Sequence, residues 1–366
     1  MHTPEWSLFR TMSLAFVSCV AGRAGIGTPR GTEAGLRRRL GKQTRPRDPW
    51  RLTRGTFPLR LTPLIVLLSA CASAPELPEG PGTLATPFGR LWYNVVGQGE
   101  GTPAIFLHGG PGFNSYYLNP MAPLGNDRPV VFYDQIGSGR SHGTVDSTAW
   151  TIPNFVRELD SLRRMLGPER VHLVGHSWGT ILAVEYWRAH PDNVASLVLM
   201  SPALSIPTWL ADADSLLATL PDSITRVVAE HEAAGTYDDP AYQNAVMAFY
   251  TEFLARRQPW SPDLDSAFAT ANMDIYNHMW GPSEFTATGI LLAYDATGWI
   301  GEIDVPVLFT TGEYDEARPA TVRTHASLIP GSEVAIIPDA AHLTMHDNPE
   351  ETNRVVREFL NRVSGG

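Results

Sequence analysis

The feature that most constrains the fold is the pentapeptide GHSWG at residues 175–179, which has the G-x-S-x-G form of a nucleophile elbow. Residues 172–174 before it are typical of a buried strand, and residues 178–190 after it have the pattern of a helix. Ser177 therefore falls at a sharp turn from strand to helix, which presents its Oγ at the carboxyl edge of a sheet. The motif predicts an α/β fold with Ser177 as a nucleophile.

The rest of the chain repeats this alternation of short apolar runs and helical patterns. The predicted strands span residues 91–96, 104–107, 130–133, 171–174, 196–200, 307–310 and 334–337, and the predicted helices span residues 152–166, 178–190 and 349–363. Several runs consist only of Val, Ile, Leu and Phe, as expected where helices cover both faces of a sheet. We therefore expect a mostly parallel central sheet.

Residues 203–301 interrupt this pattern. Strand-like runs disappear there, while aromatic residues gather among helix-forming ones. We interpret the segment as a helical cap inserted into an α/β core, whose first part spans residues 84–202 and whose second part spans residues 302–366.

The N-terminal segment differs in charge, since residues 1–70 hold 12 of the 28 Lys and Arg side chains but only three acids. An apolar run at 61–70 follows these arginines and ends at Cys71, with LSAC resembling a bacterial lipobox. We predict a leader with a lipoprotein signal peptide at 1–70, lipidation at Cys71 and a tether at 71–83. The expected location is the bacterial cell envelope, or the cytoplasm if the leader is not a signal peptide.

The remaining 296 residues carry 16 basic and 35 acidic side chains, a net charge of −19. This charge argues against nucleic acid as a partner and favours cationic ligands. The sole lysine, Lys42, lies in the leader, so the main body holds neither a Ser-Lys dyad nor a phosphate-loop lysine.

A serine nucleophile needs a histidine base and a carboxylate that orients the base, and in this type of fold the chain order is Ser, acid, His. The strand at 307–310 is followed by GEYDE, and the strand at 334–337 is followed by PDAAHLT. We therefore predict Asp315 and His342 as the partners of Ser177. Glu313 and Glu316 remain alternatives for the acid.

The second glycine-rich string, HGGPG at 108–112, follows the strand at 104–107 and has the form of a loop that donates N–H groups to an oxyanion. We predict the N–H groups of Gly110 and Trp178 as the two donors. His176 is interpreted as a packed residue of the elbow. Although His342 and His346 are four apart, no third ligand is evident, so we expect neither a metal nor an organic cofactor.

Six strings together resemble the proline iminopeptidase family: HGGPG, YDQIGSGRS at 133–141, GHSWG, MWGPSEFTATG at 279–289, GEYDE and AHLTM. Within that family the chain resembles the tricorn-interacting aminopeptidase branch, since GHSWG replaces GGSWG and Ile136 stands where many members have arginine. The resemblance implies an α/β-hydrolase fold and the release of an N-terminal residue from short peptides through an acyl-enzyme.

The resemblance also implies a site for the substrate's α-ammonium, for which Glu284 matches the family's glutamate. Charge-assisted hydrogen bonds from a cap carboxylate suit that role, and Glu252 is the candidate for a second one. Proline specificity and a broader aminopeptidase specificity both stay open. Two other hypotheses remain: an esterase, lactonase or amino-acid amidase with the same triad, and a lipoprotein that only binds a ligand.

Overall fold

The computed structural model describes residues 77–99, 101–143 and 146–364. The predicted leader and residues 71–76 of the predicted tether, Cys71 included, lie outside these residues. Within the described ranges, no helix is both long enough and apolar enough to cross a membrane.

One eight-stranded sheet forms the centre, with the order β1-β2-β4-β3-β5-β6-β7-β8. The strands are β1 (Gly80–Thr86), β2 (Gly89–Val96), β3 (Ala104–Leu107), β4 (Val130–Asp134), β5 (Val171–His176), β6 (Val194–Met200), β7 (Val307–Gly312) and β8 (Glu333–Ile337). The pairs β1–β2 and β2–β4 are antiparallel, and all other pairs are parallel. The mostly parallel sheet is therefore confirmed.

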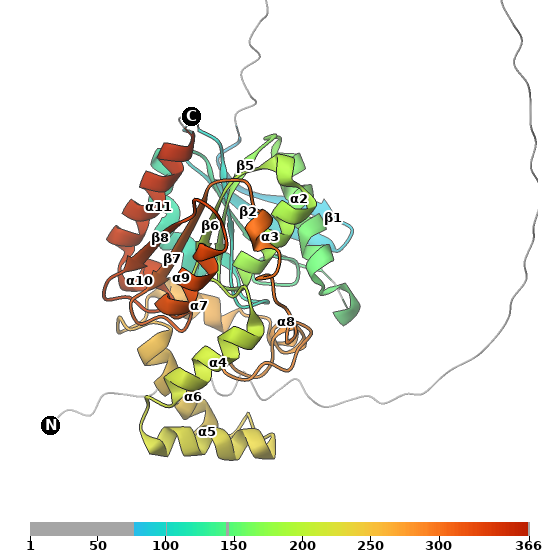
Figure 1. Cartoon of the computed structure of the whole chain (residues 1–366). Coiled ribbons are helices and arrows are strands. Elements are labelled where there is room, and N and C mark those ends of the chain that lie inside the picture. The colour runs from blue at the N-terminus through green and yellow to red at the C-terminus, as the bar shows by residue number, and fades with distance from the viewer. Residues whose placement is uncertain (1–76, 100, 144–145, 365–366) are drawn as a thin grey trace, which may run out of the picture. The chain divides into compact units, whose positions relative to one another are not determined.

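Helices cover both faces of this sheet, with α11 on one side of the strands and α2 and α3 on the other (Figure 1). The core helices are α2 (Ile152–Leu166), α3 (Trp178–Ala189), α9 (Pro319–Ser327), α10 (Thr344–Asp347) and α11 (Pro349–Ser364). Short 3₁₀ segments are η1 (Ser115–Asn126), η2 (Ser147–Ala149), η3 (Pro191–Asn193) and η4 (Ile300–Glu302).

The residues of β3 are all apolar because the strand is buried on both faces of the sheet. Ile105 and Leu107 pack into the cluster that contains α2 and α3, whereas Ala104 and Phe106 pack into the cluster that contains α11 and η1. All four residues are fully buried, because successive side chains of a strand point to opposite faces and both faces are covered.

Helix α2 shows how local sequence fixes an element's ends. Pro153 occupies the first turn, where its missing N–H costs no helical hydrogen bond. Gly167 ends the helix in the left-handed conformation (φ 94°) and donates its N–H to the Arg163 carbonyl. The predicted bounds of 152–166 are confirmed.

The insertion between β6 and β7 forms the predicted helical cap. Its helices are α4 (Ile206–Leu217), α5 (Asp222–Ala234), α6 (Pro240–Phe253), α7 (Pro262–Ala269) and α8 (Met273–Met279). In Figure 1, α4, α5 and α6 lie beyond the ends of the strands. Helices α4, α5 and α6 share an apolar cluster of their own that contains Tyr242, Phe249 and Phe285.

One prediction about the N-terminal part is wrong. Residues 80–83, assigned to the tether, belong to β1, which pairs along its whole length with β2. Gly82 lies against the ring of Tyr93, where a Cβ atom would come within 2.3 Å of Tyr93 Cζ. The sheet therefore begins before residue 84, and the tether cannot extend to residue 83.

Candidate active site

The elbow predicted at Ser177 is present between β5 and α3. Ser177 adopts φ 55° and ψ −123°, a conformation that costs energy for a non-glycine residue and persists where surrounding structure enforces it. Its N–H donates to the Met200 carbonyl at 3.0 Å. A Cβ atom on Gly175 would lie 2.4 Å from the Gly179 carbonyl oxygen, and one on Gly179 would lie 2.1 Å from that of Leu107. Both glycines are thus required sterically.

Asp315, after β7, and His342, after β8, meet at the carboxyl edge of the sheet. His342 Nδ1 lies 2.9 Å from Asp315 Oδ1, and both side chains are almost fully buried. Among the alternative acids, Glu313 is exposed and accepts the N–H of Asp339. The Oε1 atom of Glu316 lies farther from His342 Nδ1, at 3.7 Å. The geometry therefore favours Asp315 as the orienting carboxylate.

The Asp315 carboxylate is surrounded by donors. Burial alone would raise its pKa, but the charge of His342 and hydrogen bonds to the ionised form hold the pKa below its usual value. One donor was absent from the sequence analysis: the Ser201 hydroxyl, 2.6 Å from Asp315 Oδ2 and 3.0 Å from the His342 carbonyl oxygen. Ser201 directly follows β6 and has φ 49°. The Asp315–His342 pair is therefore also hydrogen-bonded to the residue at the end of a third strand.

The HGGPG loop lies directly beside the elbow. A Cβ atom on Gly109 would come within 2.9 Å of Ser177 Cβ, so only glycine permits this approach. The Gly109 N–H is already committed to the phenol oxygen of Tyr117. The N–H of Gly110, at φ 38°, remains the candidate oxyanion donor from this loop.

The second predicted donor is Trp178, the first residue of α3, whose N–H has no acceptor within the helix. Its indole Nε1 donates to Gln135 Oε1 at 2.9 Å. Gln135 also donates its N–H to His108 Nε2 and its amide to the His108 carbonyl. One side chain from the YDQIGSGRS string therefore fixes both the oxyanion loop and the helix start.

Two further carboxyl groups lie near His342: Glu284 comes from the cap, and Glu316 directly follows Asp315 in the core. Tyr276 donates its hydroxyl to Glu284 Oε1 at 2.7 Å, and the indole of Trp209 donates to the Glu284 carbonyl at 3.0 Å. Glu316 is 1% exposed, and neither of its carboxyl oxygens has a hydrogen-bond partner among the described residues. A buried carboxyl group without donors is costly, unless a ligand supplies them.

The electrostatics of these groups agree with the geometry. Burial raises the pKa of Glu316 well above its usual value, and the charges of Glu284 and then Asp315 raise it further. Burial also raises the pKa of Glu284, against the opposing effects of the Tyr276 hydroxyl and the His342 charge. The site thus holds two carboxyl groups in addition to the triad acid. Among the described residues no arginine pairs with either of them, and the one basic group within 4 Å is His342, 3.7 Å from Glu316 Oε1.

Comparisons with known proteins agree with this architecture. The family model described as alpha/beta hydrolase fold matches residues 102–349. A proline iminopeptidase of Heyndrickxia coagulans is 41% identical over 279 residues, which cover 75% of this chain and 96% of the relative. The chain belongs to the proline iminopeptidase family of α/β-hydrolase serine aminopeptidases.

Two solved structures extend the family relationship to three dimensions. VinJ superposes with a TM-score of 0.74 at 32% identity, covering 78% of this chain and 99% of VinJ. The proline iminopeptidase of Mycobacterium smegmatis has a TM-score of 0.71 at 32% identity, covering 77% of this chain and 99% of that one. The predicted α/β-hydrolase fold is confirmed.

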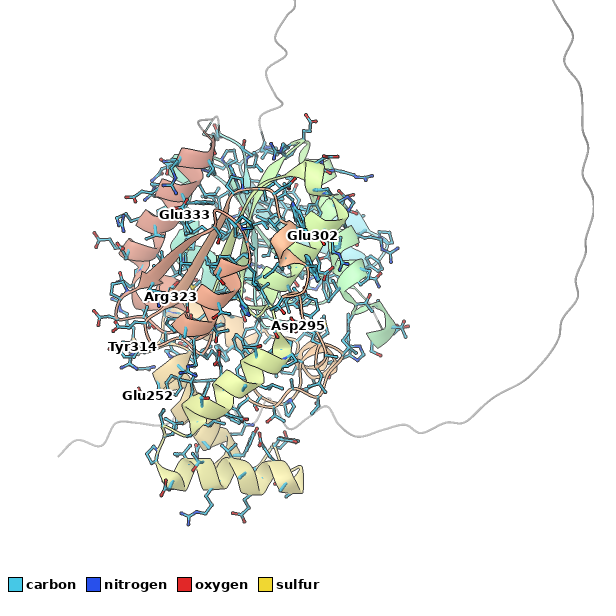
Figure 2. The ribbon with its side chains drawn as sticks, in the orientation of Figure 1. Glu252, Asp295, Glu302, Tyr314, Arg323 and Glu333 are labelled. Carbon is cyan, nitrogen blue, oxygen red and sulfur yellow. The ribbon has the colours of Figure 1, made fainter. Side chains whose placement is uncertain are left out.

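One residue predicted at this family's amine site lies elsewhere. Glu252 is exposed on α6, forms an ion pair with Arg256 at 2.9 Å, and lies at the outer edge of the cap in Figure 2. The assignment of Glu252 to substrate binding is therefore wrong. Glu316, considered in the sequence only as an alternative triad acid, is the carboxyl group that accompanies Glu284.

The second histidine of the AHLTMH string has a structural role in the proline iminopeptidase-like core. His346 Nε2 lies 2.7 Å from the Tyr117 carbonyl oxygen, and its Nδ1 lies 3.1 Å from the Ser261 hydroxyl. These two bonds join α10 to η1 and to the start of α7. Within residues 77–99, 101–143 and 146–364, no group of three or more His, Cys, Asp or Glu side chains is arranged to hold a metal ion.

Proposed function

We propose that this aminopeptidase selects substrates with a free N-terminal ammonium, which the carboxyl groups of Glu284 and Glu316 bind. The observation that carries the proposal is the buried Glu316, whose two oxygens lack donors although the side chain lies beside the triad histidine. A primary α-ammonium supplies three donors, and the protonated amine of an N-terminal proline supplies two; either group, with its positive charge, matches two adjacent carboxyl groups.

The position of the two glutamates fixes which substrate bond is cleaved. Glu316 directly follows the triad acid Asp315 in sequence, and its Oε1 lies 3.7 Å from His342 Nδ1. A free α-ammonium belongs to the first residue of a peptide, so binding it beside His342 favours presentation of that residue's carbonyl to Ser177. The site therefore favours removal of single N-terminal residues.

The proposed reaction proceeds through an aminoacyl-enzyme. Ser177 Oγ attacks the carbonyl carbon of the first residue while His342 accepts the hydroxyl proton, and Asp315 holds the other ring nitrogen. The N–H groups of Gly110 and Trp178 stabilise the oxyanion. His342 then donates its proton to the leaving amine, and a water that His342 deprotonates hydrolyses the ester bond to Ser177.

For the preferred first residue, we propose proline or a broader set that includes small residues. Relatives named proline iminopeptidases support proline. The GHSWG form of the elbow and the buried Ile136, where many members have arginine, support broader use and a likeness to the tricorn-interacting branch. Initial rates with prolyl, alanyl and leucyl arylamides, compared on one enzyme preparation, test this point.

The decisive experiment combines substrates and variants. Replacing Glu284 or Glu316 with Gln keeps the shape of the side chain and removes one charged hydrogen bond, worth about 1.5 to 3 kcal/mol, so kcat/KM for a prolyl or alanyl arylamide should fall about 10- to 150-fold. Glu252→Gln is the matched control, because this exposed glutamate should leave the rate unchanged.

The same panel separates the aminopeptidase from the other serine hydrolases considered. An N-acetylated arylamide and a simple acyl ester lack the ammonium, so an esterase or lactonase would cleave them well. An amino-acid amidase acts on free-amine substrates too, so it is distinguished by comparing an amino-acid amide with a dipeptide. Turnover confined to these amine-free substrates, or Glu316→Gln and Glu284→Gln variants with unchanged kcat/KM for free-amine substrates, would refute the proposed recognition.

We also propose that the protein is anchored in the bacterial cell envelope through a lipid on Cys71, a residue outside the described range. Support comes only from the sequence, in which an apolar run preceded by arginines ends in LSAC. Membrane fractionation of the full chain tests it, since Cys71→Ala should release the protein to the soluble fraction. A Cys71→Ala variant that still sediments with membranes would contradict it.

A further inference from the structure

His176, which precedes the nucleophile in GHSWG, makes two hydrogen bonds that connect separate parts of the site. Its Nδ1 lies 2.9 Å from the hydroxyl of Tyr117 in η1, and its Nε2 lies 3.0 Å from the backbone carbonyl oxygen of His342. The side chain is 2% exposed, so water does not compete for either nitrogen. The residue does more than fill space under the elbow.

The groups at the two ends of this series of hydrogen bonds determine which atom donates in each bond. The backbone N–H of Gly109 can only donate, so the Tyr117 oxygen accepts from it, and the phenol proton is left for His176 Nδ1. At the other end the His342 carbonyl can only accept, so the ring proton of His176 lies on Nε2. A single neutral tautomer of His176 satisfies all three bonds.

This chain of bonds, here called the Tyr117–His176 relay, begins and ends at groups of the catalytic machinery. Gly109 adjoins the candidate oxyanion donor Gly110 and lies against Ser177 Cβ. The other end is the backbone of the base, His342. The relay therefore sets the distance between the oxyanion loop and the catalytic histidine, two segments more than two hundred residues apart in sequence.

The neutral state of His176 matters because its ring centre lies 4.7 Å from that of His342. The titratable side chains around it are Tyr117, His342, Asp315 and His346. Burial lowers the pKa of His176 to about 3, with a further lowering by the charge of His342. His342 can thus take up the proton of Ser177 without a second cation beside it.

We propose that Tyr117 and His176 are positioning residues for acyl transfer, which hold the backbone of His342 in register with the oxyanion loop. Alignment of base and oxyanion donors on one carbonyl is needed only as the reaction proceeds, so its loss should lower kcat more than it changes KM. The inference rests on the proposed roles of Ser177 and His342, and it is independent of the ammonium site.

Two substitutions of similar size separate the two bonds of His176. In His176→Gln the amide nitrogen occupies the place of Nε2 and can donate to the His342 carbonyl. In His176→Asn the amide oxygen occupies the place of Nδ1, and the side chain is too short to reach that carbonyl. Tyr117→Phe removes the hydroxyl that joins Gly109 to His176.

The full-length enzyme and the three variants are compared by kcat and KM on an alanyl arylamide and an acyl ester, by the rate of Ser177 labelling with a fluorophosphonate, and by thermal unfolding. We expect His176→Asn and Tyr117→Phe to lose about tenfold in kcat, the equivalent of one neutral hydrogen bond, at nearly constant KM. His176→Gln should lose less than His176→Asn, about threefold, since it keeps the bond to the His342 carbonyl and gives up only the bond to Tyr117. The labelling rates should fall in parallel.

Two results would overturn the proposal. One is a lowered unfolding temperature in all three variants with wild-type kcat and labelling rates, which would mean that the relay only stabilises the fold. The other is a loss in His176→Gln as large as in His176→Asn, which would show that the bond to the His342 carbonyl is not the link. Because labelling needs no ammonium, the test stands even if the aminopeptidase assignment fails.

Discussion

Replacing Asp315 with Asn tests how the triad acid contributes, because the structure predicts which way the new amide turns. Five groups donate hydrogen bonds to the Asp315 carboxylate. They are His342 Nδ1 and the Ala317 N–H at Oδ1, and the hydroxyls of Ser201 and Thr311 and the Gly312 N–H at Oδ2. An amide nitrogen placed at either oxygen position therefore meets groups that now donate to it.

The two orientations of the amide differ in how well these donors can adapt. With its nitrogen at the Oδ1 position, the amide would face the Ala317 N–H, which cannot accept, and His342 Nδ1, which accepts only if the ring changes tautomer. With its nitrogen at the Oδ2 position, it would face the Gly312 N–H, which also cannot accept, but the other two groups there are hydroxyls that can turn, since Ser201 lies 3.0 Å from the His342 carbonyl and Thr311 lies 2.7 Å from that of Ala317. The second orientation keeps the Oδ1 position as acceptor for the imidazole N–H.

The variant should therefore keep the correct tautomer of His342 and lose only the negative charge. The loss lies between the difference of a charged and a neutral hydrogen bond, about 1 kcal/mol, and the interaction of unit charges about 4 Å apart at an effective dielectric constant of about 20, about 4 kcal/mol. We expect a decrease in kcat of roughly 5- to 1000-fold. A reversed amide, which enforces the wrong tautomer, would cost about 10⁴-fold.

The measurement is kcat on a prolyl or alanyl arylamide, with the concentration of active sites counted by fluorophosphonate labelling. Glu313→Gln is the control, because this glutamate of the same loop is exposed and should leave kcat unchanged. A loss of 10⁴-fold or more would refute the predicted orientation of the amide. A loss smaller than about threefold would refute the role of the Asp315 charge.

Two further predictions concern the core and the loop. The carboxyl group of Glu158 is buried, accepts the Ile136 N–H at 3.0 Å and has a pKa that burial raises from 4.5 to about 8. The folded protein thus keeps a proton that the unfolded chain releases, and the free energy of unfolding should fall as pH rises from 4.5 to about 8. Urea unfolding of Glu158→Gln should show a flatter dependence on pH and greater stability at pH 8; an unchanged slope would contradict the assignment. Gly109→Ala should fold but lose nearly all kcat, because its Cβ atom would meet Ser177 Cβ at 2.9 Å, whereas Gly298→Ala, with no atom within 4 Å, should match wild type. Wild-type kcat in Gly109→Ala would show that the loop can move away without consequence.

The core could be predicted from sequence because each of its central strands carries its own signal. Runs such as 104–107 and 307–310 are apolar throughout, since helices cover both faces, and they were found within two residues of their ends. Strand β1 was missed because GPGTLAT has one large apolar residue, Leu84, and its extended form depends on pairing with β2. An edge strand of this kind takes its structure from its neighbour, and its own residues carry little information.

The cap shows where prediction from sequence fails at the site. Helix α6 buries Tyr242, Ala245, Val246 and Phe249, and Glu252 lies beside this stripe on the solvent side, where Arg256 pairs with it. The sequence reveals that α6 is amphipathic, but not which side chains at the edge of its apolar stripe turn toward the catalytic histidine. That direction is set by packing of the whole cap on the core.

Asp315 and Glu316 in the GEYDE loop show a second limit of prediction from sequence. The loop has no periodicity from which the burial of its side chains can be deduced. Asp315 and Glu316 are adjacent in sequence and both about 1% exposed, yet their surroundings differ in one respect. Five donors surround the first, whereas the second has none among the described residues. Donors lower the pKa of Asp315 against the effect of burial, and burial raises that of Glu316.

This contrast assigns different tasks to two identical functional groups. A carboxylate that is already saturated with donors can orient the triad histidine and has no capacity left for a ligand. A buried carboxyl without donors is stable as the neutral acid until a cation arrives, and it then gains both a charge partner and hydrogen bonds. The different roles proposed for the triad acid and the ammonium site therefore follow from the hydrogen-bond donors around each group, and residue type and sequence position do not determine them.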